Sequence, residues 1–262
     1  MFALQRGSTP LVISLPHDGT DIPSALAQRM TDGALRRPDT DWHIARLYGF
    51  AGKLGASVLT PRYSRYVADL NRTPDNMALY PGADNTEVCP TTCFDRSPIY
   101  RHDLPTDEEI GERVAGYWWP YHHALAEELD RLQEQHGVAL LFDAHSIRSV
   151  VPRFFTGELP HFNLGTADGE SCSPALEKQI ADVLGRAGGY THVVNGRFKG
   201  GYITRHYGRP AIGIHAVQLE LAQRSYMDED YPFTYRESLA ARIQPVLKAL
   251  LVAMLEWAKP GE

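Results

Sequence analysis

The sequence predicts an α/β protein with a mixed central sheet and helices on both faces. Short runs of β-type apolar residues alternate along the chain with stretches of helical period. Two of these runs, Leu11–Leu15 and Val138–Phe142, lead into histidines, which is typical of a sheet that carries a site at its edge. The chain has 262 residues, 43% hydrophobic and 22% charged, an ordinary composition for a globular protein. We therefore expect a single α/β domain spanning residues 1–262.

The first third of the chain predicts two or three strands around one helix. Leu11–Leu15 is the first expected strand. Apolar residues then recur at helical spacing from Ile44 to Leu54, and Gly55 is a natural end for that helix. Ser57–Thr60 is the next expected strand, and Tyr66–Leu70 is expected to form another.

A long irregular segment and a long helix are expected next. Residues Asn71–Leu104 are rich in Pro, Asn, Asp and Thr without a period, as in a functional loop or lid. Thr106 and Glu109 have the spacing of a capping box. Gly137 is expected to end the helix that they begin, and Pro120 is expected to kink or split it.

The rest of the chain continues the alternation and ends in a helix. We expect the following elements in order: the strand that leads to His145, an irregular loop over Pro152–Ser171, a helix that begins at Ser173-Pro174 and stops at Gly188-Gly189, strands over Thr191–Val194 and Ala211–Leu221, and a last helix over about Arg236–Trp257.

Charge and cysteine content exclude several classes of protein. The formal net charge is −6 and the pI about 6.0, and no run of Lys or Arg stands out, so we expect no nucleic-acid partner. Cys89, Cys93 and Cys172 are an odd, small number, which argues against a disulfide framework. We find no apolar run near the ~20 residues of a membrane span and no signal-peptide pattern, so we expect a cytoplasmic protein without a membrane partner. Nothing in the sequence indicates the oligomeric state.

Two histidines at strand ends suggest a metal site. His17 and His145 each follow an apolar run and lie beside an acidic residue. A single histidine after a strand more often makes a structural hydrogen bond, but two in equivalent positions favour zinc, which in hydrolytic sites takes three His or carboxylate ligands and a water. For the third ligand we choose Asp41. Asp39 is the second choice, and His43 could serve or could hydrogen-bond a ligand.

A late glutamate is the candidate general base. Glu220 is in phase with Ile214, Ala216 and Gln218 on one face of an expected strand. A carboxylate there is costly unless it has a partner, and a water activated by a metal is the partner that we expect. The alternative is a glutamate at the exposed end of an edge strand. Asp143, two residues before His145, could orient a ligand histidine or could only cap the turn.

Arginines near the expected strand ends favour an anionic substrate. Asp69, Asn71 and Arg72 follow an expected strand, and the guanidinium fork of arginine matches a carboxylate. Arg197 and Arg205 lie in glycine-rich loops, where backbone can approach a ligand closely. Each of these could also be a solvated surface residue.

Several strings in one order resemble the N-formylglutamate amidohydrolase family, and the resemblance covers nearly the whole chain. The strings that carry it span residues 14–19, 39–43, 64–72, 79–82, 143–149, 195–205 and 218–221. The resemblance implies a fold similar to zinc carboxypeptidases and aspartoacylase. In that wider group the acidic ligand falls three residues after the first histidine, where this sequence has Thr20, so the acidic ligand must come from elsewhere.

The resemblance also implies an activity and residue roles. The expected reaction is hydrolysis of N-formyl-L-glutamate to formate and L-glutamate, as in histidine degradation. It uses Zn²⁺ or another divalent ion on His17, Asp41 and His145, with Glu220 as the base. The two carboxylates of a small dianionic N-acyl amino acid would be held by Arg72, with Asp69 and Asn71 and one or more of Arg65, Arg197 and Arg205.

Three other functions remain open from the sequence. The nearest is zinc-dependent removal of another acyl group from an acidic amino acid, as with N-acetylaspartate-like substrates. A non-haem iron oxygenase also uses two histidines and one carboxylate. A non-catalytic binder of anionic metabolites could use the arginines alone.

Overall fold

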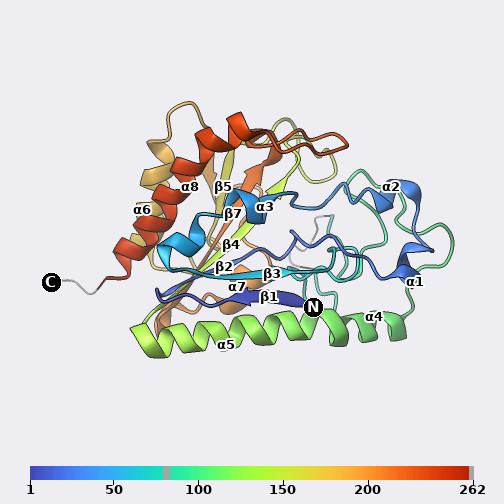
Figure 1. Cartoon of the computed structure of the whole chain (residues 1–262), viewed down its shortest axis with the longest axis horizontal. Helices are drawn as coiled ribbons and strands as arrows, with labels where there is room; N and C mark the ends of the chain where they lie inside the picture. Colours follow the sequence, from blue (N-terminus) through green and yellow to red (C-terminus); the bar gives the residue numbers. More distant parts are fainter. Residues whose placement is uncertain (79–81, 83, 260–262) are drawn as a thin grey trace.

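The central sheet is mixed, as we expected. The structure is a computed structural model that describes residues 1–78, 82 and 84–259. Its seven strands lie in the order β1-β3-β2-β4-β7-β5-β6 (Figure 1). β1 is antiparallel to β3 and β5 is antiparallel to β7, whereas the other neighbours are parallel. The strands are β1 Phe2–Gln5, β2 Leu11–Ser14, β3 Ser57–Pro61, β4 Ala139–Ile147, β5 Phe162–Gly165, β6 His192–Val194 and β7 Ile214–Ala222.

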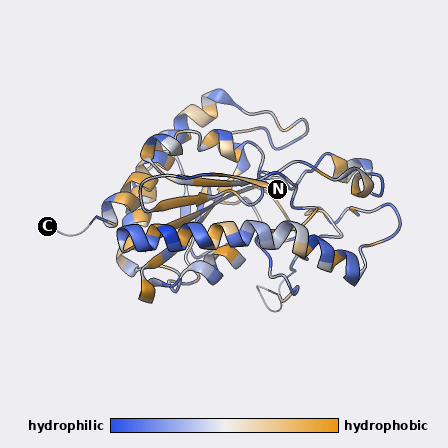
Figure 2. Ribbon diagram, turned by 60° about the horizontal axis from the view of Figure 1, so that its bottom comes forward, coloured by the Kyte–Doolittle hydropathy of each residue, from blue (hydrophilic) through white to orange (hydrophobic). Residues whose placement is uncertain are grey.

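Helices cover both faces of this sheet, which confirms the expected architecture (Figures 1 and 2). α5 and α7 pack on one face, and α3, α6 and α8 pack on the other. The helices are α1 Ser24–Ala27, α2 Asp32–Leu35, α3 Ile44–Leu47, α4 Asp107–Arg113, α5 Trp119–His136, α6 Pro174–Gly185, α7 Tyr202–Tyr207 and α8 Glu237–Trp257, with shorter turns η1 Ala51–Leu54, η2 Val114–Trp118, η3 Pro210–Ile212 and η4 Gln223–Ser225.

The alternation of side chains along the strands decides which residues can form a site. Leu140 and Phe142 of β4 pack toward α6 and α8, whereas Leu141 packs toward α5. Successive side chains of a strand point to opposite faces, so Asp143 and His145 lie on the face of α5 and α7. By the same alternation, Ser14 of β2 and Gln218 and Glu220 of β7 share that face near the carboxyl ends of three parallel strands.

The long helix begins and ends where the sequence predicts. The Thr106 hydroxyl accepts a hydrogen bond from the backbone N–H of Glu109, whose carboxylate pairs with Arg29 and Arg113. The helix ends at Gly137, which has a φ of 75°. α4 and α5 are joined by η2, a π-helical turn directly before the expected break at Pro120.

Two predictions about local structure are wrong. Tyr66–Leu70 forms turns rather than a strand: the N–H of Val67 bonds to the carbonyl of Ser64, and the N–H of Asp69 bonds to the carbonyl of Val88. Conversely, the expected loop Pro152–Ser171 contains β5, which pairs with β6 and β7 from later parts of the chain.

Two other expected elements have different bounds. The predicted helix over residues 44–54 is split into α3 and η1, and Gly55 ends it with a φ of 72°. β7 begins at Ile214 rather than at Ala211, because Pro210–Ile212 forms a 3₁₀ turn.

One helix corrects the expectation about membrane spans. α8 is long and apolar enough to cross a membrane by length and composition alone. A core helix meets the same criterion, and Ile243, Leu247, Leu250 and Leu251 of α8 are fully buried in the core.

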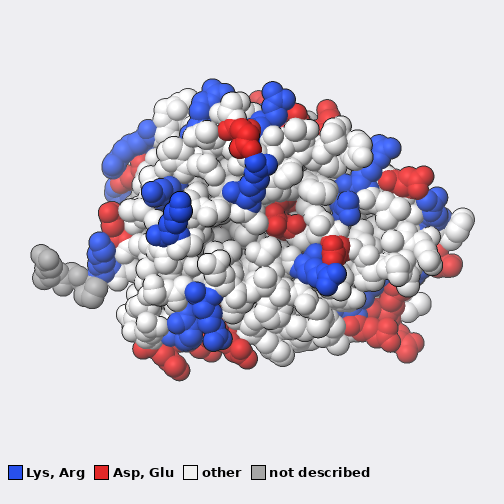
Figure 3. Space-filling view, in the orientation of Figure 1, with Lys and Arg blue, Asp and Glu red and all other residues white. Residues whose placement is uncertain are grey.

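On the face in Figure 3, Lys and Arg side chains stand in separate groups with Asp and Glu among them.

A candidate metal centre at the carboxyl ends of the strands

Three residues predicted as metal ligands meet in one buried cluster. His17 lies in the turn after β2, and Asp41 lies between α2 and α3, where its N–H donates to the carbonyl of His17 at 3.1 Å. His145 lies within β4. The sequence had suggested that this strand stops at the histidine, but it continues to Ile147. One ligand atom from each of the three lies within 4.8 Å of the others.

The contacts of the two imidazoles indicate which nitrogen carries the proton. Nε2 of His17 lies 2.7 Å from Oδ1 of Asp69, and Nε2 of His145 lies 2.9 Å from Oδ2 of Asp143. An ionised carboxylate only accepts hydrogen bonds, so each Nε2 donates to it, and in the neutral imidazole Nδ1 is left with a lone pair. Nδ2 of Asn71 also lies 3.0 Å from Nε2 of His145, and both nitrogens donate to Oδ2 of Asp143. This is the arrangement by which carboxylates orient metal-bound histidines.

The three remaining atoms are acceptors that converge on one place. Nδ1 of His17 lies 3.2 Å from Nδ1 of His145 and 3.7 Å from Oδ2 of Asp41, and Nδ1 of His145 lies 3.1 Å from the same oxygen. Three acceptors this close repel one another unless a proton or a cation lies among them. The donor set of two imidazoles and a carboxylate therefore fits zinc or a similar divalent ion.

The surrounding charges also favour a cation. Burial acts to lower the pKa of His145, but the carboxylates of Asp143 and Asp41 outweigh it and hold that pKa well above its usual value. Burial acts to raise the pKa of Asp41, but the two neighbouring histidines outweigh it and hold that pKa well below its usual range. Arg65 pairs with Asp69 at 2.6 Å and lies 3.8 Å from Asp41, so one guanidinium faces two buried carboxylates and a third, that of Asp143, lies beside them.

Glu220 lies beside this cluster. β4 and β7 are parallel, and their register pairs His145 with Glu220, so both side chains project from the same face. Glu220 is 8% exposed. Burial raises its pKa to about 8; Asp41 adds to this effect and His145 opposes it.

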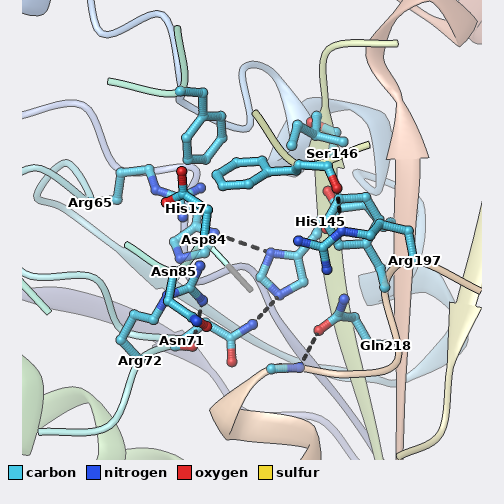
Figure 4. Close-up of a pocket in the computed structure, with 16 residues that line it drawn as sticks. His17, Arg65, Asn71, Arg72, Asp84, Asn85, His145, Ser146, Arg197 and Gln218 are labelled. Carbon is cyan, nitrogen blue, oxygen red and sulfur yellow. Dashed lines mark hydrogen bonds between the residues drawn. The ribbon is translucent and has the colours of Figure 1, made fainter. Parts of the chain in front are cut away.

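An open cavity lies over the cluster (Figure 4). Arg72 and Arg197 approach it from opposite sides (Figure 4). The Arg65 guanidinium pairs with Asp69 and lies 4.8 Å from the centre of the Phe94 ring. Nε of Arg72 donates to the carbonyl and hydroxyl of Thr86, and Nε of Arg197 donates to the carbonyl of Phe154. The cavity is lined by His17, Arg65, Asn71, Arg72, Asp84, Asn85, Phe94, His145, Ser146, Ile147, Phe154, Arg197, Phe198, Gly201, Gln218 and Glu220.

Two residues predicted to bind substrate do not line this cavity. Asp69 is fully buried, and its oxygens accept from His17, Arg65 and the N–H of Asn71. Arg205 is an exposed residue of α7 whose Nε donates to the carbonyl of Gly200. Contact of Asp69 and Arg205 with substrate therefore stays a prediction, without support from the lining of this cavity.

The alternative third ligands lie elsewhere. Oδ2 of Asp39 accepts from the Tyr66 hydroxyl at 2.7 Å and from the N–H of Phe94 at 2.9 Å, and burial raises its pKa to about 6. Nε2 of His43 lies 2.7 Å from the carbonyl of Phe233. Of the three candidates, Asp41 is the residue in the cluster with His17 and His145.

Several lining residues were not predicted. Gln218 has a sequence signal, since it is two residues before Glu220 on the same strand face. Phe94, Phe154 and Phe198 come from separate loops, and no pattern in the sequence brings them together. Of the string over residues 79–82, only Gly82 falls among the described residues.

The chain is similar to known proteins over nearly its full length. A family model described as N-formylglutamate amidohydrolase matches residues 9–227. An N-formylglutamate deformylase of Pseudomonas putida is 53% identical over 258 residues, 98% of this chain and 96% of the relative. One of Pseudomonas aeruginosa is 52% identical over 260 residues, 99% of this chain and 97% of the relative. The crystal structure of an N-formylglutamate amidohydrolase from Ralstonia eutropha superposes with a TM-score of 0.81 at 27% identity, over 98% of this chain and 96% of that one.

Proposed function

Because the chain belongs to the N-formylglutamate amidohydrolase family, we propose that it hydrolyses N-formyl-L-glutamate to formate and L-glutamate. The two Pseudomonas relatives carry the name of this activity. The observation that supports it most is the position of Glu220 beside His17, Asp41 and His145, in a cavity lined by arginines. We further propose that the protein works in the cytoplasm, in histidine degradation.

His17, Asp41 and His145 would hold one divalent ion, for which zinc is our choice. Bound there, the ion would polarise an amide carbonyl and lower the pKa of water toward neutrality. Asp69 and Asp143 would keep Nδ1 of each histidine turned toward that position.

Glu220 would move the proton. Its carboxylate would take a proton from water as the water oxygen bonds to the formyl carbon, and would deliver it to the nitrogen as the C–N bond breaks. Formate and the amine of glutamate are then the two products. Its burial supports this role, because a poorly solvated carboxylate binds a proton more readily.

Arg72 and Arg197 would hold the two carboxylates of the substrate. They lie on opposite sides of the cavity, which suits a molecule with an acid group at each end (Figure 4). Arg65 also lines the cavity, but its pairing with Asp69 makes it a support for His17 as well. Asn71 would contribute through the position of Arg72, since the Asn71 carbonyl accepts from Nη1 of Arg72.

The nearest alternative keeps the chemistry and changes the acyl group or the acidic amino acid. Rates with N-formyl-L-glutamate, N-acetyl-L-glutamate and N-acetyl-L-aspartate separate the two. We expect the N-formyl substrate to give the highest kcat/KM. A higher value for either N-acetyl compound would contradict the proposed substrate.

The role of Glu220 is tested with Glu220→Gln, which keeps the shape but cannot accept the proton. We expect kcat to fall by about 10²- to 10⁴-fold with bound zinc unchanged. Glu158→Gln is the control, because Glu158 is exposed and pairs with Arg224 outside the cavity. A Glu220→Gln enzyme with normal turnover would remove this residue from the mechanism.

A further inference from the structure

We propose that Asp143 is a positioning residue that holds the metal ligand His145 and the cavity residue Asn71 together, and that Ser14 and Tyr121 hold Asp143 in place. The proposal rests on the proposed function for the role of His145. It assigns a task to three buried side chains that would not touch substrate or metal.

One carboxylate oxygen of Asp143 accepts hydrogen bonds from two residues of the site. Oδ2 of Asp143 lies 2.9 Å from Nε2 of His145 and 3.3 Å from Nδ2 of Asn71. Asp143 and His145 are two residues apart on one strand and therefore share a face. A shift of this carboxylate would thus move a metal ligand and the wall of the cavity at the same time.

The other oxygen of Asp143 is held by a chain of hydroxyl groups. Oγ of Ser14 donates to Oδ1 of Asp143 at 3.1 Å, and the register of β2 and β4 places these two residues opposite each other. The Ser14 hydroxyl donates its one hydrogen to this carboxylate, so at the 3.0 Å contact with Tyr121 it can only accept. The Tyr121 hydroxyl also lies 3.4 Å from the carbonyl of Leu59, and Ser14 is the nearer of its two acceptors. Ser14 and Asp143 are fully buried and Tyr121 is 1% exposed, so water does not compete for these bonds.

Asn71 extends this network to α7. Oδ1 of Asn71 accepts from the N–H of Ile203 at 2.8 Å, and its carbonyl accepts from the N–H of Tyr202 at 3.3 Å. A Cβ on Gly201 would lie only 2.4–2.5 Å from the amide atoms of Asn71, so a glycine is needed at this close approach. Asp143 therefore joins the end of β4, the segment before Arg72 and the start of α7.

Affinity for zinc and the absorption spectrum of the Co²⁺-loaded protein test the proposal, since the spectrum reports the geometry of the donors. We expect Asp143→Ala to lower zinc affinity by about 10- to 100-fold and to change the Co²⁺ spectrum. Ser14→Ala should lower the affinity by a smaller factor, roughly 3- to 10-fold. Asp143→Asn has one acceptor oxygen and cannot serve both Ser14 and His145, so it should lie between Asp143→Ala and the wild type.

Two control variants separate this role from general loss of stability. Ser57 is also a buried serine that donates to a buried carboxylate, that of Glu128, but on β3 and away from the cluster. The Tyr48 hydroxyl is buried and has no hydrogen-bond partner among the described residues. Ser57→Ala is the match for Ser14→Ala, and Tyr48→Phe removes a buried hydroxyl that is not part of the network. Both controls should leave the metal affinity and the spectrum unchanged.

The outcomes distinguish this proposal from the proposed function. Wild-type zinc affinity and an unchanged spectrum in Ser14→Ala and Asp143→Asn would overturn the positioning role, even if Asp143→Ala fails to fold. An equal loss in Ser57→Ala would also overturn it. The proposed function is tested by hydrolysis of N-formyl-L-glutamate, so it can fail while the metal measurements still support Asp143.

Discussion

At the scale of single residues, His122 is a buried histidine whose protonation couples stability to pH. It lies on α5 with 2% exposure, and Nε2 lies 2.8 Å from the carbonyl of Leu70 while Nδ1 lies 3.0 Å from the Tyr207 hydroxyl. Burial lowers the pKa of His122 to about 3, from an ordinary 6.5. As the pH falls below 6.5, His122 therefore becomes protonated in the unfolded chain but stays neutral in the folded protein until the pH approaches 3.

The sign of the effect follows from this difference. Between pH 6.5 and 3 the unfolded state binds the proton and the folded state does not, so this contribution to stability is present above pH 6.5 and is lost as pH falls. We expect the metal-free wild type to lose about 1.4 kcal/mol per pH unit from this group below pH 6. His122→Gln should lose less stability between pH 6.5 and 4.5 in urea titrations. His123→Gln changes the exposed neighbour and should lose as much stability as the wild type over the same pH range. If the free energy of unfolding fell equally with pH in the wild type and both variants, this assignment would be contradicted.

The site residues that could be predicted are those whose position depends on strand ends. His17 and His145 lie where two neighbouring parallel strands reach the same edge, so an apolar run before each was enough to find them. The position of Asp69 could not be predicted from the sequence, because it depends on a turn in which its own carboxylate accepts a hydrogen bond from the N–H of Asn71. The sequence pattern suggested a strand there, and with it a substrate contact.

At the scale of elements, the end of α5 depends on the left-handed conformation of Gly137. Its φ is 75°, which side chains other than glycine adopt at a cost. A Cβ there would meet nothing within 4 Å, so the cost is one of backbone strain alone. We expect Gly137→Ala to lower the free energy of unfolding by about 1 kcal/mol, measured by urea denaturation.

Gly111 is the matched control because it lies in the middle of α4, is exposed and also leaves open space for a Cβ. Alanine favours the helix at such a position, so Gly111→Ala should raise the stability by up to about 1 kcal/mol. Loss of stability in both variants would contradict the conformational explanation for Gly137.

The elements that the sequence failed to predict owe their form to distant contacts. Tyr66 and Val67 have strand propensity, but in the structure they pack with Met30 and Ile99 in a small separate core. β5 forms because β7 and β6 lie on either side of it and pair with its four residues. Neither partner can be inferred from the residues of the segment itself.

At the scale of the whole molecule, the proposed ion would connect the sheet to a loop and should stabilise the fold. An ion present at 100 times its dissociation constant adds about 2.7 kcal/mol, so removal with a chelator should lower Tm by roughly 5–10 °C. Zn²⁺ should restore both Tm and hydrolysis. Mg²⁺ should not, because it prefers oxygen ligands. Full activity after exhaustive chelation would contradict the metal centre.

The fold class could be predicted because it depends on the order in which strand-like and helix-like patterns of apolar residues follow one another along the chain. Strand and helix patterns alternate, and the mixed sheet with helices on both faces confirms that prediction. The antiparallel strands β1 and β5 were not predicted; each pairs with a strand that is distant in the sequence, β3 and β7 respectively. A single domain over residues 1–262 and a likeness to zinc carboxypeptidases stay predictions.

The order of the strands has a consequence for synthesis on the ribosome. β7 is the last strand in the chain, yet it lies between β4 and β5 and is the strand that joins the β5–β6 pair to the other four. Until residues 214–222 emerge, β4 and β5 each present an open edge to other nascent chains. The same segment brings Glu220, so the sheet is completed and the proposed active site acquires its proposed base at the same stage of translation.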